Sequence, residues 1–144
     1  MRLLNYFIAI LFCLPCRTVV AQTGVHQVNQ AIAANSSYYT STYQYLHANP
    51  ELSRAEINTA AFLKKEMKNL GWELVDSLGY QSFAAILRNG KGPTILYRTD
   101  MDGLPLKELT GLPFASKGSA MHACGHDVHM SSWLGTAQLL TRLK

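Results

Sequence analysis

The sequence predicts an α/β fold, because helical segments with one apolar face alternate with short runs of apolar residues. In the helical segments, apolar residues recur at spacings of three or four, which is the period of a helix face. The runs at residues 83–87 and 94–97 are nearly continuous, as is typical of strands buried on both faces of a sheet. Between them, Asn-Gly-Lys-Gly at residues 89–92 indicates a hairpin turn.

Residues 1–21 have the pattern of a secretory signal peptide. Arg2 provides a positive charge before a mostly apolar run at residues 3–14. Val19-Val20-Ala21 then offers a cleavage site before Gln22. The apolar run is shorter than the roughly 20 residues that a membrane-spanning helix needs. We therefore expect export to the periplasm or the extracellular space without stable membrane insertion; an uncleaved membrane anchor is the alternative.

A polar leader at residues 22–42 contains the start of the first predicted helix. This helix is expected over residues 26–47. The Asn49-Pro50 pair that follows predicts its end, because the residue before a proline disfavours the helical conformation.

The second helix is predicted to start at a capping box, Ser53-Arg54-Ala55-Glu56, in which the serine and glutamate side chains satisfy free backbone N–H groups. Gly71 is placed to end this helix in a left-handed conformation. A strand is expected directly afterwards, at residues 72–75. The predicted apolar stripe of the helix consists of Ile57, Ala60, Leu63, Met67 and Leu70.

The last helix is predicted over residues 127–143, with Asp127 as its N-cap. No Gly or Pro stop signal follows it, and its apolar stripe continues to Leu143. We therefore expect the chain to be the N-terminal part of a longer precursor. The residues expected to point inward are Met130, Leu134, Ala137, Leu140 and Leu143.

The charge of the chain gives no indication of a nucleic-acid partner. The formal net charge is +4, and Arg2 and Arg17 in the predicted signal peptide supply two of the positive charges. The longest basic run in the remainder is the pair Lys64-Lys65. A nucleic-acid-binding domain would carry a basic patch or stripe, so we expect no nucleic-acid partner.

Residues 121–129 contain three His, one Cys and one Asp, which are side chains that bind borderline-soft metals. Zinc is the first expectation, and Mn, Co or Ni also suit these ligands. Of the three cysteines, Cys13 and Cys16 lie in the predicted signal peptide, so Cys124 has no intrachain disulfide partner after cleavage. A lone thiol in an oxidising compartment favours a metal-bound thiolate over a buried, inert cysteine.

The spacing within this stretch separates stronger from weaker candidates. Cys124 and His126 are two residues apart in a loop, so their side chains turn the same way around Gly125. His129 is expected in the first helical turn. His122 is left open as a ligand, a hydrogen-bond partner of a ligand, or a surface residue.

Two acidic residues, Asp100 and Asp102, come just past the carboxyl end of the predicted strand at residues 94–97. Sites in open α/β sheets gather at that edge. Alternation along an extended chain places both carboxylates on one side. There they can bind a metal, or one of them can orient a ligand or act as a base. The alternative is an ordinary solvated turn.

Together, residues 98–105 and 121–127 resemble the metal-dependent amidohydrolases that include hippurate hydrolase, N-acyl-amino-acid amidohydrolase and the plant indoleacetyl-amino-acid hydrolases. These enzymes belong to the aminoacylase and glutamate-carboxypeptidase clan of co-catalytic metallopeptidases. The motifs at residues 47–56 and 108–115 match as well, so the resemblance runs from about Tyr43 to Leu140. It implies a three-layer α/β/α sheet, of which residues 43–144 form the N-terminal part of the catalytic domain.

The resemblance also implies roles for single residues. Cys124 and His126 are implied to bind one or two divalent ions, and Asp102 is the implied catalytic residue that orients a ligand. Asp100 stands where related peptidases have a ligand His, so its role stays open. The general-base Glu and the remaining ligands of the family come later than Lys144, as does the lid domain through which relatives form homodimers.

The implied activity is metal-dependent hydrolysis of the amide bond of N-acyl amino acids or small peptides. Residues 22–144 alone are expected to be inactive, because no residue matches the general base. Glu108 is the nearest acidic candidate, and we expect it in an exposed loop.

Two other function classes stay open at this point. Four residues, His122, Cys124, His126 and His129, could close a structural zinc site in a non-catalytic secreted module. A secreted binding protein that has lost catalysis is the third interpretation. The pair of aspartates argues against the structural zinc site, which would not need them.

Overall fold

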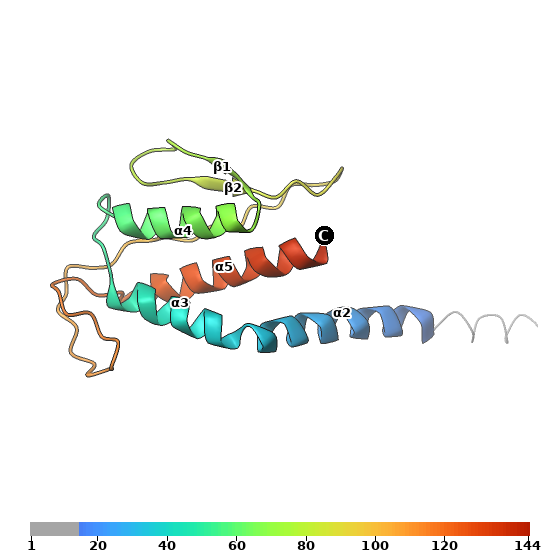
Figure 1. The fold of residues 1–144 in the computed structure, drawn as a ribbon, viewed down its shortest axis with the longest axis horizontal. Helices are drawn as coiled ribbons and strands as arrows, with labels where there is room; N and C mark the ends of the chain where they lie inside the picture. The colour runs from blue at the N-terminus through green and yellow to red at the C-terminus, as the bar shows by residue number, and fades with distance from the viewer. Residues whose placement is uncertain (1–14) are drawn as a thin grey trace, which may run out of the picture. The chain divides into compact units, whose positions relative to one another are not determined.

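The computed structural model describes residues 15–144, and in this part of the chain four helices accompany a two-stranded sheet (Figure 1). The predicted α/β fold class is thus confirmed. Residues 3–14, the apolar part of the predicted signal peptide, lie outside the described residues, so this expectation stays a prediction. None of the described helices is long and apolar enough to cross a membrane.

The single helix predicted over residues 26–47 is wrong, because two helices are present there. They are α2, Pro15–Ala34, and α3, Ser36–Ala48. At the end of α2 the side chain of Asn35 donates a hydrogen bond to the carbonyl of Ala31 at 2.7 Å. Such a side-chain bond offers the backbone an alternative to continuing the helix. The chain divides near this point into two compact units, one ending at Ser36 and one beginning at Ser37.

Helix α4, Ile57–Asn69, does not begin with the predicted capping box. Glu56 occupies the N-cap position, but its side chain makes no capping hydrogen bond. The carboxylate of Glu51 caps the helix instead, since it accepts the N–H groups of Asn58 at 3.1 Å and Thr59 at 2.7 Å. Burial alone would raise the pKa of Glu51, but these donors outweigh it and lower the pKa.

Replacing Glu51 with alanine should destabilise the protein by about 1 kcal/mol, as is typical when a helix loses its N-cap acceptor. Ser53→Ala is the matched control, because the sequence gives Ser53 the capping role that the structure gives Glu51. The free energy of unfolding from urea titrations measures both. A larger loss from Ser53→Ala than from Glu51→Ala would restore the capping box.

The end of α4 and the first strand follow the prediction. Gly71 has a φ of 78°, the left-handed conformation expected of it. Strand β1, Glu73–Val75, pairs antiparallel with β2, Ala84–Ile86, with Leu74 opposite Ala85. The hydrophobic runs at residues 72–75 and 83–87 therefore both contain strands.

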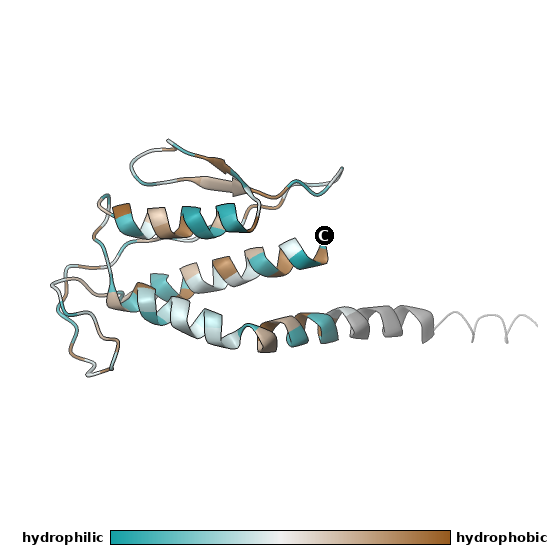
Figure 2. Ribbon diagram, viewed as in Figure 1, coloured by the Kyte–Doolittle hydropathy of each residue, from teal (hydrophilic) through white to brown (hydrophobic). Residues whose placement is uncertain are grey.

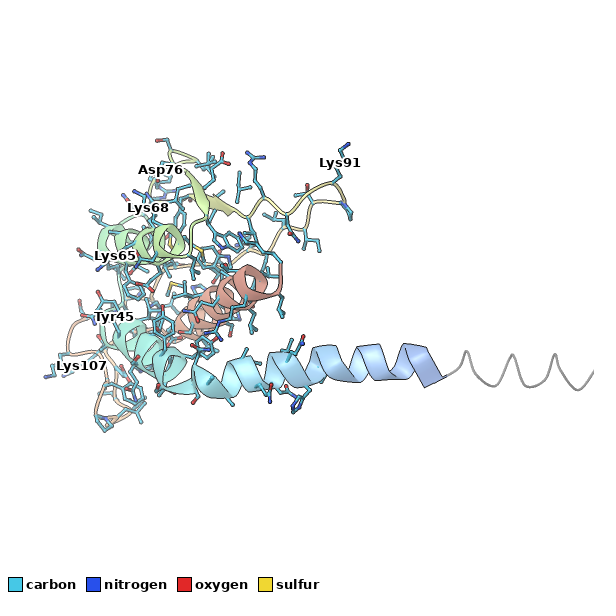
Figure 3. All side chains as sticks on the ribbon, turned by 45° about the vertical axis from the view of Figure 1, so that its right-hand side comes forward. Tyr45, Lys65, Lys68, Asp76, Lys91 and Lys107 are labelled. Atoms are coloured by element: carbon cyan, nitrogen blue, oxygen red, sulfur yellow. The ribbon has the colours of Figure 1, made fainter. Side chains whose placement is uncertain are left out.

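The predicted strand at residues 94–97 is not formed. Its side chains Ile95 and Leu96 are 88% and 87% exposed. The preceding turn is present, with Gly90 at a φ of 84° and Lys91 at its tip (Figure 3). A strand needs a hydrogen-bonding neighbour, and the described sheet contains only β1 and β2.

The core lies between α4 and α5, His126–Leu143, with α3 contributing at one end. Polar and apolar residues alternate along both helices in Figure 2. Three predicted core residues, Ile57, Leu140 and Leu143, are exposed, because they lie at helix ends beyond this contact. The fully buried members are Leu46, Leu63, Met67, Met130 and Leu134, and Ala137 is nearly so.

Candidate metal centre

Backbone contacts bring the acidic motif at residues 98–105 next to the metal-binding motif at residues 121–129. Leu104 and Met121 form an antiparallel bridge with N–H to carbonyl distances of 2.8 and 2.9 Å. The N–H of Gly103 donates to the carbonyl of Glu51 at 2.7 Å. A β-carbon at Gly103 would lie 2.9 Å from the β-carbon of Pro50 and 3.2 Å from the carbonyl oxygen of Met121. Only glycine fits this close approach. The approach holds Asp102 beside the metal-binding motif at residues 121–129.

Residues 121–126, here called the Cys-Gly-His loop, make a turn that leads into α5. The N–H of Gly125 donates to the carbonyl of His122 at 3.0 Å, and Gly125 has a φ of 75°. Gly125, not Asp127, is the N-cap of α5, so the predicted cap is wrong. The left-handed glycine moves the cap two residues earlier than predicted and places Asp127 inside the first turn of the helix.

The side chain of His126 is oriented by Asp102. Its Nδ1 lies 2.8 Å from the backbone carbonyl oxygen of Asp102 and 3.0 Å from the carboxylate Oδ1 of the same residue. Both oxygens accept hydrogen bonds, so Nδ1 carries the proton. In the neutral ring, Nε2 then keeps a lone pair that can bind a metal. This is the usual way in which a carboxylate or carbonyl fixes the tautomer of a metal-binding histidine.

The other members of the loop region face different surroundings. Cys124 is exposed, and so is His129, whose ring stacks on that of His126 with 6.1 Å between centroids. His122 is only 5% exposed, and neither of its ring nitrogens has a hydrogen-bond partner among the described residues. Burial lowers the pKa of His122, which favours its neutral form.

Asp100 and Asp102 do not act as a pair in this structure. Asp100 forms an exposed ion pair with Arg98, whereas Asp102 contacts His126. Of the alternatives that the sequence leaves open, joint metal binding by the two carboxylates is not seen in these contacts. Asp102 contacts His126, and its role in orienting a ligand stays a prediction.

The donor chemistry of the loop suits a divalent ion of the zinc type, because cysteine thiolates and imidazole nitrogens are the usual protein ligands of zinc. Among the described residues, however, no three His, Cys, Asp or Glu side chains lie where they could hold one ion together. The four-ligand zinc site is thus not assembled in this structure: His122 is buried and Cys124 is exposed. Ligation by Cys124 and His126 stays a prediction that their donor types support.

A buried histidine with two carboxylate partners lies next to this loop, and the sequence did not predict it. Nδ1 of His47 is 2.7 Å from Oδ2 of Asp127, and its Nε2 is 3.0 Å from Oε1 of Glu108. Glu108 is only 7% exposed, so its predicted position in an exposed loop is wrong. Its neighbour Lys107 is the residue that points outward (Figure 3). A loop glutamate next to a lysine carries no local signal of burial.

The charges in this cluster support one another. Burial alone would lower the pKa of His47, but its hydrogen bonds to Glu108 and Asp127 raise it. The pKa of Glu108 falls from 4.5 to about 2, mainly because the hydroxyl of Thr110 donates to it, with help from His47 and the N–H of Ser116. The raised pKa of His47 and the lowered pKa of Glu108 both favour the ion-paired form of this contact over the neutral one.

These shifts predict a pH window for stability. Glu108 stabilises the fold above its ordinary pKa of 4.5, and this contribution is lost as the pH falls toward about 2. His47 stabilises below its ordinary pKa of 6.5, and its contribution is lost as the pH rises through its raised pKa. The difference in unfolding free energy between wild type and His47→Gln should be largest between pH 4.5 and 6.5. Urea titrations across this range measure it, and a flat difference would contradict the charged state.

Comparisons with known proteins identify relatives over most of the chain. The sequence pattern of the Peptidase family M20/M25/M40 matches residues 96–144. N-acetyl-L-cysteine deacetylase of Bacillus subtilis is 48% identical over 99 residues, which are 67% of this chain and 24% of that protein. Hippurate hydrolase of Campylobacter jejuni is 41% identical over 97 residues, covering 66% of this chain and 25% of that protein.

Solved structures agree with these relatives. The Bacillus subtilis YXEP protein, a dinuclear metal binding peptidase from the M20 family, matches with a TM-score of 0.71 and 38% identity. The match covers 76% of this chain and 32% of that one. A putative aminohydrolase from methicillin-resistant Staphylococcus aureus matches with a TM-score of 0.77 and 33% identity, over 82% and 31% of the two chains. The chain spans about a quarter of the length of the curated relatives it matches.

Proposed function

We propose that this chain, which matches the pattern of the peptidase family M20/M25/M40 over residues 96–144, forms the N-terminal part of a metal-dependent amidohydrolase. The observation that carries the proposal is the contact between His126 and Asp102. It leaves Nε2 of His126 free for a metal, two residues from the exposed thiol of Cys124. We refer below to the longer product, of which this chain would be a part, as the complete protein.

In the proposed mechanism, Cys124 and His126 bind a divalent ion, and Asp102 holds the His126 ring in the binding tautomer. When bound, such an ion lowers the pKa of a water molecule and polarises the acyl carbonyl of the substrate. The proton transfers require a general base, which we assign to a later part of the complete protein. Glu108 does not supply it, because its carboxylate is buried against His47.

For the substrate we propose an N-acyl amino acid or a small N-acylated peptide. Several relatives are named for this chemistry, including N-acetyl-L-cysteine deacetylase, N-acetyldiaminopimelate deacetylase and hippurate hydrolase. The metal is zinc, manganese, cobalt or nickel, in one or two copies. Homodimerisation through a lid domain in the complete protein is proposed on the resemblance alone.

An amine-release assay tests this function. The complete protein is offered acetyl, benzoyl and indoleacetyl amino acids, each with and without a chelator and with Zn²⁺, Mn²⁺ or Co²⁺ restored afterwards. We expect hydrolysis that the chelator abolishes and a metal restores. Residues 22–144 alone should release no amine. Hydrolysis that resists the chelator would contradict the proposed function.

We also propose that the protein is exported and cleaved before Gln22, as the composition of residues 1–21 indicates. N-terminal sequencing of protein recovered outside the cytoplasm of a bacterial host tests this. The expected sequence starts at or near Gln22. A stable chain that starts at Met1 and stays in the membrane fraction would contradict the proposal.

A further inference from the structure

We propose that His47 is a positioning residue for the metal centre: it joins the loop at residues 105–116 to the first turn of α5 and so fixes the direction in which the Cys-Gly-His loop presents its ligands. This inference rests on the proposed function, because it assumes that Cys124 and His126 bind a metal. It gives a role to a buried, charged cluster that the proposed mechanism otherwise leaves unused.

The cluster connects three segments that are far apart in the sequence. His47 lies at the end of α3, Glu108 in the loop at residues 105–116, and Asp127 in the first turn of α5. The ring of His47 spans the gap with its two nitrogens, at 2.7 Å from Asp127 and 3.0 Å from Glu108. All three side chains are at least 90% buried, so water does not compete for these contacts.

Each carboxylate has a further donor from its own segment, so neither is free to turn. Oε2 of Glu108 accepts the N–H of Ser116 at 2.6 Å, and its Oε1 also accepts the hydroxyl of Thr110. Oδ1 of Asp127 accepts the N–H of Val128 at 2.9 Å. These donors fix each carboxylate within its own segment, and His47 joins one carboxylate to the other.

Aromatic side chains hold the ring of His47 at its place. Its centroid lies 5.3 Å from that of Phe114 and 5.5 Å from that of Tyr43. A smaller or uncharged side chain at position 47 would leave two buried carboxylates without a shared cation. Buried charges without a partner are strongly unfavourable, so the segments would move apart or admit water.

The path from this cluster to the metal ligands is short. Asp127 is joined by a peptide bond to His126, whose ring is held on its other side by Asp102. The start of α5 is thus fixed at two places, by Asp102 at His126 and by His47 at Asp127. Residues that orient metal ligands in this way typically change metal affinity or activity 10- to 100-fold when they are replaced.

The test measures Co²⁺ affinity of the complete protein by competition with a chelator, at a temperature where circular dichroism shows every variant to be folded. We expect His47→Gln to weaken Co²⁺ binding about 10- to 100-fold. Glutamine can donate to one carboxylate but carries no charge and cannot join both in the same geometry. Glu108→Gln breaks the same connection with a smaller change in shape and should weaken binding in the same direction.

A stability control separates positioning from a purely structural role. Met67→Ala removes a fully buried side chain that packs against the later part of α5. It should lower the melting temperature at least as much as His47→Gln while leaving Co²⁺ affinity unchanged. If His47→Gln does not fold, Glu108→Gln alone decides the outcome.

The results distinguish this inference from the proposed function. If wild type and Met67→Ala bind Co²⁺ equally and the two cluster variants also bind it equally well, the positioning role is wrong while the function stands. If wild type binds Co²⁺ but hydrolyses no N-acyl amino acid, the proposed function fails and a 10-fold or larger loss in His47→Gln still supports the positioning role. Absence of Co²⁺ binding by the wild type would overturn both.

Discussion

Replacing Cys124 or His126 with alanine should lower kcat/KM of the complete protein for its N-acyl amino acid about 100-fold or more, because each change removes a proposed metal ligand. Residues that merely orient such ligands already cost 10- to 100-fold. When the metal is limiting, the loss should appear mainly in kcat. Excess substrate should not restore the activity. The measurement is steady-state amine release over a range of Zn²⁺ concentrations.

His129→Ala is the matched control for this prediction. Its ring stacks on His126 but is exposed, and no hydrogen bond fixes it among the described residues. We expect His129→Ala to keep most of the wild-type kcat/KM. A loss equal to that of Cys124→Ala would favour the closed site made of His122, Cys124, His126 and His129. Full activity in both Cys124→Ala and His126→Ala would remove the ligand assignment.

Gly103→Ala should destabilise the protein by about 1–3 kcal/mol, which is the usual cost of forcing an extra carbon into a packed site. The new β-carbon would lie 2.9 Å from that of Pro50 and 3.2 Å from the carbonyl oxygen of Met121. Neither neighbour is the free end of a flexible side chain, so the three chain segments that meet here must move apart. Because Asp102 is the preceding residue, its contact with His126 should weaken and metal affinity should fall as well.

The control for Gly103→Ala is Gly118→Ala, where an added β-carbon meets nothing within 4 Å. Urea titrations and Co²⁺ competition on both variants provide the comparison. We expect Gly118→Ala to match wild type in both. If Gly103→Ala is as stable as wild type, the close approach of residues 50, 103 and 121 is not a constraint on the fold.

The parts of the fold that the sequence predicts well are those that depend on local patterns. The last helix was expected over residues 127–143 and is found at His126–Leu143. Gly71 ends α4 in the expected left-handed conformation, and α3 ends before Pro50. Helix periodicity and the backbone preferences of Gly and Pro act within a few residues, so they are readable without tertiary structure.

The wrong predictions depend on contacts between distant residues. The cap of α4 comes from Glu51, outside the expected Ser-x-x-Glu box, because the intervening chain turns back through Arg54 at a φ of 70°. The run at residues 94–97 has strand-like residues but no strand neighbour in the described sheet. Patterns within one segment carry no information about whether a partner strand is present.

The candidate site also contains residues that the sequence predicts and residues that only the folded chain reveals. Cys124, His126 and Asp102 were chosen from residue type, spacing and family resemblance, and the structure brings Asp102 and His126 into contact. The His47 cluster was missed because its members lie 61 and 80 residues apart along the chain. A single histidine near a helix end and a loop glutamate are common on protein surfaces, so only the folded chain shows that they meet.

We propose above that Cys124 binds the metal through its sulfur, together with His126. The most direct test is the absorption spectrum of the complete protein after its native metal is replaced by Co²⁺. We expect a thiolate-to-cobalt charge-transfer band that disappears in Cys124→Ser, weakens in His126→Ala and stays in His129→Ala. A thiolate band that persists in Cys124→Ser, or bound Co²⁺ without such a band in the wild type, would contradict the assignment.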